Sequence, residues 1–437
     1  MRWLFVFLIT LLITSDFLGH NPGLGPGLSV KNATLYLIAM ALMFNMTLSG
    51  NFRWRMPVLH MAWAMWIGYA ILTFLTAWLV IHYRNYDALQ SAIGLKSELI
   101  DSAIYCFVAF YGVQNEKDFR TVMSALAAAM GISSMLTLTD LAGLTHLGTK
   151  LGETGAEADR VFGAFGNANE TGAILGCLLP AVIATALSSH GARRVFWLGC
   201  SVATALVFAL TVSRGAYVGL AVGYPIAALM FRQVIPPGRI ATGALIVVGM
   251  VVLGAVMVSI ADPAAAAAIA DRVLGIGTMG MSEASSGRTD IWAQALNEMM
   301  AYPVSLITGF GWNVYSTMPT IFAMHNTYLD QWFNLGMLGV AVYVIILYNT
   351  IATARRAAKL AQPPMQTDMI AYVFGMMALA VTIFFGNLYT SKPYIWMYVG
   401  LTMRGAVFIL DKVAAERTPA TPAPAVRLGV RTSLRRA

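Results

Sequence analysis

The chain has 437 residues, of which 58% are hydrophobic and 11% are charged, with a mean hydropathy of +0.69 and a net charge of +8. Soluble globular proteins carry roughly 25% charged residues. This composition therefore excludes a soluble multidomain protein and predicts a chain that lies in a lipid bilayer.

Apolar runs that are long enough to cross the roughly 30 Å hydrocarbon core as helices recur along the sequence. We predict an all-α integral membrane protein with about twelve transmembrane helices. The first run lacks a small-residue cleavage site before His20, so we treat it as a span rather than a signal peptide. The predicted spans are residues 3–19, 31–50, 57–81, 98–114, 120–142, 169–188, 195–213, 215–231, 240–260, 331–353, 367–388 and 393–411.

Lys and Arg residues are distributed unevenly between the predicted loops, and cationic loops are retained in the cytoplasm. With both termini in the cytoplasm, 18 of the 28 cations fall on the cytoplasmic side and 9 on the outer side. The positive charge therefore indicates topology. It does not indicate nucleic-acid binding, which would need a basic face with base-stacking aromatic residues. Cys106, Cys177 and Cys200 fall in predicted spans, where thiols pack as small apolar groups.

Four regions follow from this pattern: spans one to nine in residues 1–260, a long outer loop in 261–330, the last three spans in 331–411, and a basic tail in 412–437. The tail is rich in Ala, Pro, Thr and Arg, so we expect it to be disordered. The loop of about 70 residues is much longer than an ordinary connection, and long loops on a rigid scaffold often carry function. We expect helices within it at 262–272 and around Arg288.

Two outer segments contain glycines at positions that favour specific turns. Residues 163–170, with the sequence Gly-Ala-Phe-Gly-Asn-Ala-Asn-Glu, are typical of a tight turn into a helix cap. In Gly309-Phe310-Gly311, the paired glycines predict that the backbone closely approaches another segment. Nearby aromatic residues offer stacking faces for sugars or form an ordinary interfacial belt. These are Trp292, Tyr302, Trp312, Tyr315, Tyr328 and Trp332.

Three ionisable residues on the predicted outer side are candidates for chemistry. Arg214 follows an apolar run directly, Arg288 lies in the long loop, and His325 precedes a new apolar helix. Each has an ordinary structural explanation: a snorkelling arginine, a solvated loop arginine and a helix-capping histidine. The functional interpretation is that two planar guanidiniums grip a phosphate while an imidazole with an ordinary pKa of about 6.5 acts as a base. It depends on the three residues acting together.

The sequence has no Asp-x-Asp, no His-x-x-x-His and no Cys/His set at metal-ligand spacing. It also has no Walker A loop and no dinucleotide fingerprint. We therefore predict a site without a metal, a nucleotide or another cofactor.

Five short motifs make the chain resemble the O-antigen ligase and polymerase superfamily of membrane proteins that transfer glycans, and their order fits the ligase branch. The departure is Ala168, where members of the superfamily often have proline. The motifs are Phe165-Gly166-Asn167-Ala168-Asn169, Ser213-Arg214-Gly215-Ala216, Ser286-Gly287-Arg288 through Ile291-Trp292, Gly309-Phe310-Gly311 and His325-Asn326-Thr327-Tyr328-Leu329.

The resemblance implies a protein of the bacterial inner membrane with its active site at the periplasmic face. Its fold would be similar to that of metal-independent, C-type membrane glycosyltransferases. The donor would be a polysaccharide on undecaprenyl diphosphate, and the acceptor would be a sugar of the lipid A core. Arg214 and Arg288 would bind the diphosphate, and His325 would assist the acceptor hydroxyl. Residues expected to support the site are Asn167, Asn169, Arg160, Asn326, Tyr328 and Trp292.

Three alternatives share parts of this pattern. A polymerase would extend one lipid-linked glycan with another, and a protein O-oligosaccharyltransferase would transfer the glycan to a protein hydroxyl. Both use the same donor, so the donor-side motifs do not separate them from a ligase. A transporter for lipid-linked glycans would have related halves and charged groups at the bilayer midplane. Because the candidate groups gather on one face and no internal repeat is seen, the sequence favours an enzyme.

Overall fold

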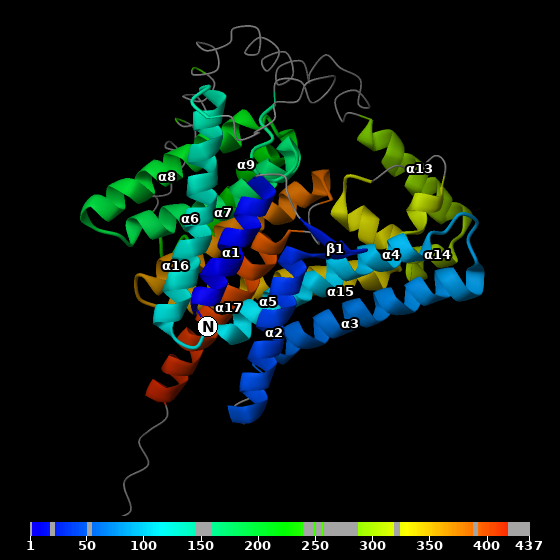
Figure 1. Cartoon of the computed structure of the whole chain (residues 1–437), viewed down its shortest axis with the longest axis horizontal. Coiled ribbons are helices and arrows are strands. Elements are labelled where there is room, and N and C mark those ends of the chain that lie inside the picture. The colour runs from blue at the N-terminus through cyan, green and yellow to red at the C-terminus, as the bar shows by residue number, and fades with distance from the viewer. Residues whose placement is uncertain are drawn as a thin grey trace, which may run out of the picture.

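The structure is a computed structural model that describes residues 2–17, 22–49, 55–145, 160–236, 287–318, 324–387 and 392–417, together with three isolated positions between 237 and 286. In these ranges it is a bundle of helices (Figure 1) with one short two-stranded hairpin. The predicted span at 240–260 and the predicted helix at 262–272 lie outside the described residues.

The first half of the chain forms a run of helices around the hairpin. They are α1 (Arg2–Phe17), β1 (Gly23–Gly25), β2 (Leu28–Ser29), α2 (Val30–Ser49), α3 (Pro57–Leu75), η1 (Thr76–Ile81), α4 (Ala88–Leu95), η2 (Lys96–Ile100), α5 (Asp101–Gly112) and α6 (Glu116–Leu141). The hairpin is antiparallel and pairs Gly23 with Ser29.

The second half supplies the central helices and the segments around the candidate residues. They are α7 (Ala168–Leu187), α8 (Gly191–Leu210), α9 (Arg214–Met230), α13 (Arg288–Ala301), α14 (Val304–Thr308), η5 (Val314–Thr317), α15 (Thr327–Leu360), α16 (Met365–Thr382), η6 (Ile383–Phe385) and α17 (Pro393–Arg417).

Eight helices in the described residues are long and apolar enough to cross a membrane: α2, α3 with η1, α6, α7, α8, α15, α16 with η6, and α17. Each overlaps a predicted span. The predictions at 3–19, 98–114 and 215–231 also fall on helices, but α1 has 16 residues, α5 has 12 and α9 has 17. The all-α multi-pass fold is confirmed, and the count of twelve stays a prediction.

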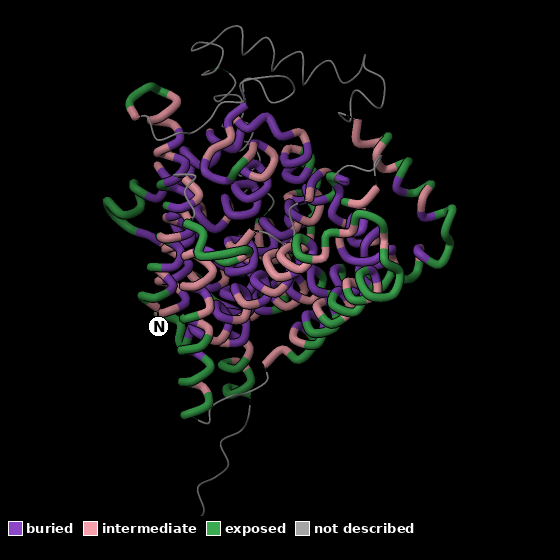
Figure 2. The backbone as a smooth tube through the Cα atoms, turned by 45° about the vertical axis from the view of Figure 1, so that its right-hand side comes forward, coloured by how far each residue is buried: buried purple, intermediate pink, exposed green. Residues whose placement is uncertain are grey.

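Burial divides the helices into a centre and a periphery (Figure 2). In the apolar stretch of α7, 83% is buried inside the protein, whereas in the apolar stretch of α2 only 17% is buried. Large apolar side chains such as Met40, Met43 and Phe44 of α2 are exposed. An apolar surface of this extent is costly in water and favourable against lipid. The exposed faces of the outer helices are therefore explained by a bilayer.

Glycines let the central helices approach each other closely, as is common in membrane bundles. A Cβ atom on Gly375 of α16 would lie 2.0 Å from the carbonyl oxygen of Cys177 in α7, and one on Gly400 of α17 would lie 1.9 Å from that of Cys106 in α5. All three cysteines are buried and free, as predicted. The thiols thus fill space beside these crossings.

Asparagine side chains start three of the helices. Asn115, Asn167 and Asn326 are the N-caps of α6, α7 and α15, and each accepts a hydrogen bond from the backbone N–H three residues later. This bond satisfies one of the donors that a helix start leaves open. The predicted turn into a cap at residues 163–170 is confirmed, with positive φ angles of 59° at Gly163 and 96° at Gly166.

The Gly309-Phe310-Gly311 turn binds to a break in α15, which confirms the predicted close approach. The backbone N–H groups of Phe310 and Gly311 donate to the carbonyls of Phe333 and Asn334 at 2.8 and 3.0 Å. Gly336 has non-helical backbone angles, with φ 61° and ψ −165°, where two helical pieces of α15 meet. The loop therefore occupies the backbone groups that the break exposes.

Ion pairs fall into two sets that agree with the predicted grouping of loops. At one end, Lys31 pairs with Asp16, Lys96 with Asp101 and Lys392 with Glu170, and all six lie at predicted outer boundaries. At the other end, the pairs are Arg2–Asp118, Arg55–Asp411 and Arg120–Asp368. Which set faces the periplasm stays a prediction.

One predicted boundary is wrong at the last helix. We expected a disordered tail from residue 412, but α17 continues to Arg417. Residues 412–417 are good helix formers in the main, with two alanines, a lysine and a glutamate, so the helix extends past the apolar run that guided the prediction. The remaining tail lies outside the described residues.

Candidate functional site

His325 lies on an exposed turn directly before α15 and has a positive φ of 47°. This backbone conformation is uncommon for residues other than glycine and costs energy unless its surroundings hold it. The next residues hold it here: Asn326 is buried and caps α15, and the hydroxyl of Thr327 donates to the carbonyl of Gly386 at 2.7 Å. The imidazole is thus presented at the surface by a buried anchor.

Arg288 is the first residue of α13, which begins after Gly287 in a left-handed conformation (φ 77°). One helical turn later, the indole of Trp292 donates to the carbonyl of Met324 at 2.7 Å. Residues four apart share one helix face, with Cβ atoms about 5–6 Å apart. Because Met324 directly precedes His325, this bond fixes the Arg288 end of α13 next to the His325 turn.

Arg214 is the first residue of α9, and Ser213 is its N-cap. Gly215 packs so closely on Phe385 of η6 that an added Cβ atom would lie 2.7 Å from the Phe385 Cβ atom. The start of α9 is therefore in direct contact with η6.

The segment Phe384-Phe385-Gly386 contacts all three candidate segments. Phe385 meets Gly215 beside Arg214, and the carbonyl of Gly386 accepts from Thr327 beside His325. The ring of Phe384 packs edge to face on Trp292, with 5.6 Å between ring centroids, one turn from Arg288. Three residues that are far apart in sequence thus gather around one short turn at the end of α16.

A buried hydrogen-bond network lies behind Arg214. Arg160 is 4% exposed, its Nε donates to the carbonyl of Thr211 at 3.0 Å, and its guanidinium also donates to the side-chain oxygen of Asn169 at 2.7 Å. The same oxygen of Asn169 accepts from the hydroxyl of Ser213 at 3.2 Å. The network joins the N-termini of α7 and α9, so Arg160 and Asn169 position the start of the helix that carries Arg214.

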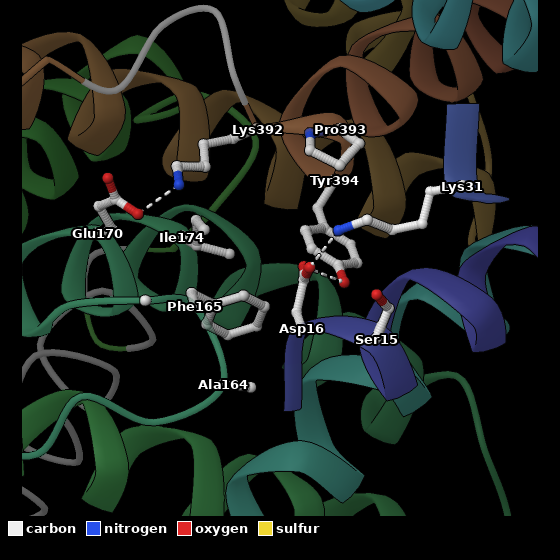
Figure 3. Close-up of a pocket in the computed structure, with 11 residues that line it drawn as sticks. Ser15, Asp16, Lys31, Ala164, Phe165, Glu170, Ile174, Lys392, Pro393 and Tyr394 are labelled. Atoms are coloured by element: carbon white, nitrogen blue, oxygen red, sulfur yellow. Dashed lines mark hydrogen bonds and ion pairs between the residues drawn. The ribbon is translucent and has the colours of Figure 1, made fainter. Parts of the chain in front are cut away.

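A cavity of about 360 Å³ lies beside Phe165 and Glu170, on either side of the Asn167 cap in the sequence (Figure 3). Two ion pairs line it: Lys392 with Glu170, and Lys31 with Asp16 at 2.7 Å. The hydroxyl of Tyr394 also donates to Asp16 at 2.9 Å, and the Phe165 ring packs edge to face on Tyr394. The cavity combines charged groups with two ring faces beside a predicted motif.

The aromatic residues of the region mostly join backbone segments. Trp292, Trp312 and Trp332 donate from their indoles to the carbonyls of Met324, Ser91 and Leu306. The hydroxyl of Tyr328 donates to the carbonyl of Ala380 at 2.8 Å. These bonds stabilise the arrangement of the loop and α15, whereas Tyr302 is 62% exposed.

Tyr315 is a half-buried titratable group of this loop. Burial raises the pKa of Tyr315, and the nearby carboxylates of Asp330 and Glu98 raise it further. The phenol therefore stays protonated at neutral pH and is a poorer base there than an exposed imidazole.

Glu170, Lys392 and the turn at Phe384-Phe385-Gly386 were not predicted from the sequence as parts of the site. Glu170 follows the Gly-Asn-Ala-Asn motif directly, so its position could have indicated it. Residues 384–386 end an apolar run and carry no ionisable group, so they give no chemical signal. In the part of the chain that the structure describes, no group of three or more His, Cys, Asp or Glu residues is placed to hold a metal ion.

The helical fold and its eight apolar helices define a multi-pass helical membrane protein. Within it, residues 198–344 match the Wzy_C family model, described as O-Antigen ligase, and this range includes Arg214, Arg288 and His325. This match over residues 198–344 confirms the resemblance to the O-antigen ligase family that the motifs predicted. Arg160, Asn167, Asn169 and residues 384–386 lie outside the matched range. No curated protein matches the chain.

Proposed function

We propose that the protein is an O-antigen ligase that transfers a polysaccharide from undecaprenyl diphosphate to a sugar hydroxyl of the lipid A core at the periplasmic face. The observation that carries this proposal is the meeting of the Arg214, Arg288 and His325 segments around Phe384-Phe385-Gly386. The family match supports the glycan-transferring class.

On the donor side, Arg214 and Arg288 bind the diphosphate. Breaking the bond between sugar C1 and the diphosphate oxygen leaves the electron pair and its negative charge on that oxygen. Each arginine begins a helix, where backbone N–H groups and the helix dipole also favour an anion. Guanidiniums held in place beforehand stabilise this charge without reorganisation during the reaction.

On the acceptor side, His325 accepts the proton of the attacking hydroxyl as the new glycosidic bond forms. An imidazole with a pKa near neutrality is suited to this transfer. A single direct displacement inverts the configuration at C1. The exposed turn that carries His325 allows a large acceptor to approach from the aqueous side.

The test is reconstitution of the purified protein in lipid vesicles with an undecaprenyl-diphosphate-linked polysaccharide and lipopolysaccharide that lacks O-antigen, with EDTA present. We expect extended lipopolysaccharide from the native protein. Arg288→Gln and Arg214→Gln should each lower the transfer rate about a hundredfold, because loss of one stabilising charge costs on the order of 3 kcal/mol.

The test of His325 needs a substitution that tolerates the positive φ angle at this position. His325→Asn is suitable because asparagine tolerates the left-handed conformation but is no base at neutral pH. We expect a folded protein with transfer reduced at least a hundredfold. If His325→Asn transfers the glycan at the native rate, His325 does not act as the base. Products in which the glycan grows on its lipid carrier, or is attached to protein, would show a polymerase or an oligosaccharyltransferase instead.

A further inference from the structure

The opposite end of the bundle from His325 holds a cluster of cations. α16 has 18 residues and runs from Met365, shortly after the end of α15, to the Phe384-Phe385-Gly386 turn of the candidate site, so the two ends lie roughly 27 Å apart. Arg355, Arg356 and Lys359 lie in its last turns, Arg232 follows the end of α9, and Arg417 ends α17. The three helices bring the five cations together from separate parts of the sequence.

These cations line two neighbouring cavities. One, of about 370 Å³, lies between Arg355, Arg356, Lys359 and Arg417, with Ala352 and Leu360 as apolar walls. The other, of about 350 Å³, lies between Arg232, Gln233 and Arg355, with Ile226, Leu229 and Met230 as apolar walls. Arg355 lines both cavities. Among the residues that the structure describes, no acidic side chain lines either of them.

The charge in these cavities is not compensated within the described part of the chain. None of the five cations forms an ion pair there, although Arg2, Arg55 and Arg120 at the same end do. In addition, the Nε atom of Arg355 is buried and has no hydrogen-bond partner. A buried donor without a partner is unfavourable, and like charges one helical turn apart, as at Arg355 and Lys359, repel.

Helix dipoles and membrane topology explain part of this cluster, because cations are favoured at helix C-termini and in cytoplasmic loops. For both effects it is enough that the cations are exposed to solvent, as Arg193 and Arg194 are. These effects do not account for an arginine whose Nε atom is buried without a partner and which lines two cavities with apolar walls. An anionic ligand with an apolar part accounts for the charge, the buried donor and the walls together.

We propose that the two cavities bind phosphate groups of an anionic phospholipid in the cytoplasmic leaflet. Phosphodiester oxygens would accept hydrogen bonds from Arg355 and its neighbours, and the acyl chains would lie along the apolar walls. Basic pockets between membrane helices on the cytoplasmic side are suited to such headgroups. A lipid with two phosphodiesters, such as diphosphatidylglycerol, places one phosphate in each cavity, so it binds more tightly than a lipid with one. This inference does not depend on the glycosyl transfer proposed above.

The experiment measures retention of added lipids by the purified full-length protein with native mass spectrometry. The probes are diphosphatidylglycerol, phosphatidylglycerol and phosphatidylcholine, each at the same concentration. We expect affinity to fall in that order, and Arg355→Gln/Lys359→Gln to weaken diphosphatidylglycerol binding at least tenfold. Arg193→Gln/Arg194→Gln removes the same charge from the same end of the bundle without touching a cavity, and should leave binding within twofold.

Several results would overturn the proposal. Equal losses in the two double variants would mean that the lipid responds to overall charge rather than to the cavities. Equal affinity for phosphatidylcholine would remove the role of the anionic headgroup. If inorganic phosphate competes with the lipid at equal concentration, the site binds the free anion and not the lipid. Thermal unfolding in detergent checks that the Arg355 variant is folded, and Arg355→Lys provides a charged substitute that should retain partial binding.

Discussion

Arg160 shows how one buried side chain can fix the start of the helix that carries Arg214. Its guanidinium contacts the carbonyl of Thr211 and the side chain of Asn169, two groups that precede or begin different helices. A lysine would retain the charge but could not make both bonds, because its ammonium is a point charge rather than a planar fork. The start of α9, and with it Arg214, depends on this geometry.

We predict that Arg160→Lys lowers the free energy of unfolding by about 1–3 kcal/mol, the cost of leaving a buried partner unsatisfied. Transfer should also slow, because the N-terminus of α9 loses its support. Thermal unfolding in detergent and the reconstituted transfer assay measure the two effects. Arg193→Lys, at an exposed position, is the matched control and should change neither. An unchanged melting temperature in Arg160→Lys would contradict the structural role.

At the scale of elements, the break in α15 joins the long loop to the helix that carries the His325 turn. Gly309 and Gly336 both have positive φ angles, and their backbones touch: a Cβ on Gly336 would lie 2.0 Å from the carbonyl oxygen of Ile307. A Cβ on Gly309 would lie 2.4 Å from the carbonyl oxygen of Asn334. Neither contact can relax by rotation of a flexible side chain.

Gly309→Ala should therefore destabilise the protein by about 2–5 kcal/mol, from left-handed backbone strain and overpacking combined. The matched control is Gly143→Ala, where φ is also positive, at +70°, but nothing lies within 4 Å of the added Cβ atom. That variant should lose only about 1–2 kcal/mol. Denaturation of both variants in the same detergent checks the difference, and equal losses would argue against the close packing.

At the scale of the whole molecule, the bundle has two chemically different ends. The candidate residues, the caps at Asn167 and Asn326 and the 360 Å³ cavity lie at one end, while the cations without an ion pair among the described residues lie at the other. α6, α7, α8 and α16 connect the two ends. Reaction and lipid contact are thus expected on opposite membrane faces.

This arrangement predicts where introduced cysteines react. The native cysteines are buried, so a membrane-impermeant maleimide has little background. Leu144, which is 77% exposed after α6, and Arg194, which is exposed at the start of α8, lie at opposite ends. In intact cells with a permeable outer membrane, Leu144→Cys should be labelled from outside, and Arg194→Cys only after the inner membrane is opened. Labelling of both from the same side would refute the proposed orientation.

Much of the fold could be predicted from the sequence because apolar length and helix caps are local signals. The overlap of eight predicted spans with long apolar helices, the cap at Asn167 and the close approach at Gly309 are of this kind. The end of α17 could not be placed, because helix propensity continues past the apolar run. The length of α5 was also missed, because the predicted span included residues of the preceding η2.

The candidate site was predictable in its ionisable members but not in its assembly. Arg214, Arg288 and His325 are rare polar groups in an apolar chain, so composition draws attention to them. The turn at Phe384-Phe385-Gly386 acts through ring packing, one carbonyl and contact with Gly215. Such contacts join segments more than 50 residues apart, and a single sequence contains no local signal for them. The catalytic and binding roles of the three ionisable residues stay predictions.

The position of that turn also sets the time at which the site can form during synthesis. A ribosome makes Arg214, Arg288 and His325 well before residue 386, and the segment that holds their neighbourhoods together enters the bilayer only with α16. A nascent chain in which α16 has not yet been inserted therefore contains Arg214, Arg288 and His325, but their segments are not yet held together. The three segments can therefore meet only late in translation, when nearly the whole bundle is already in the membrane.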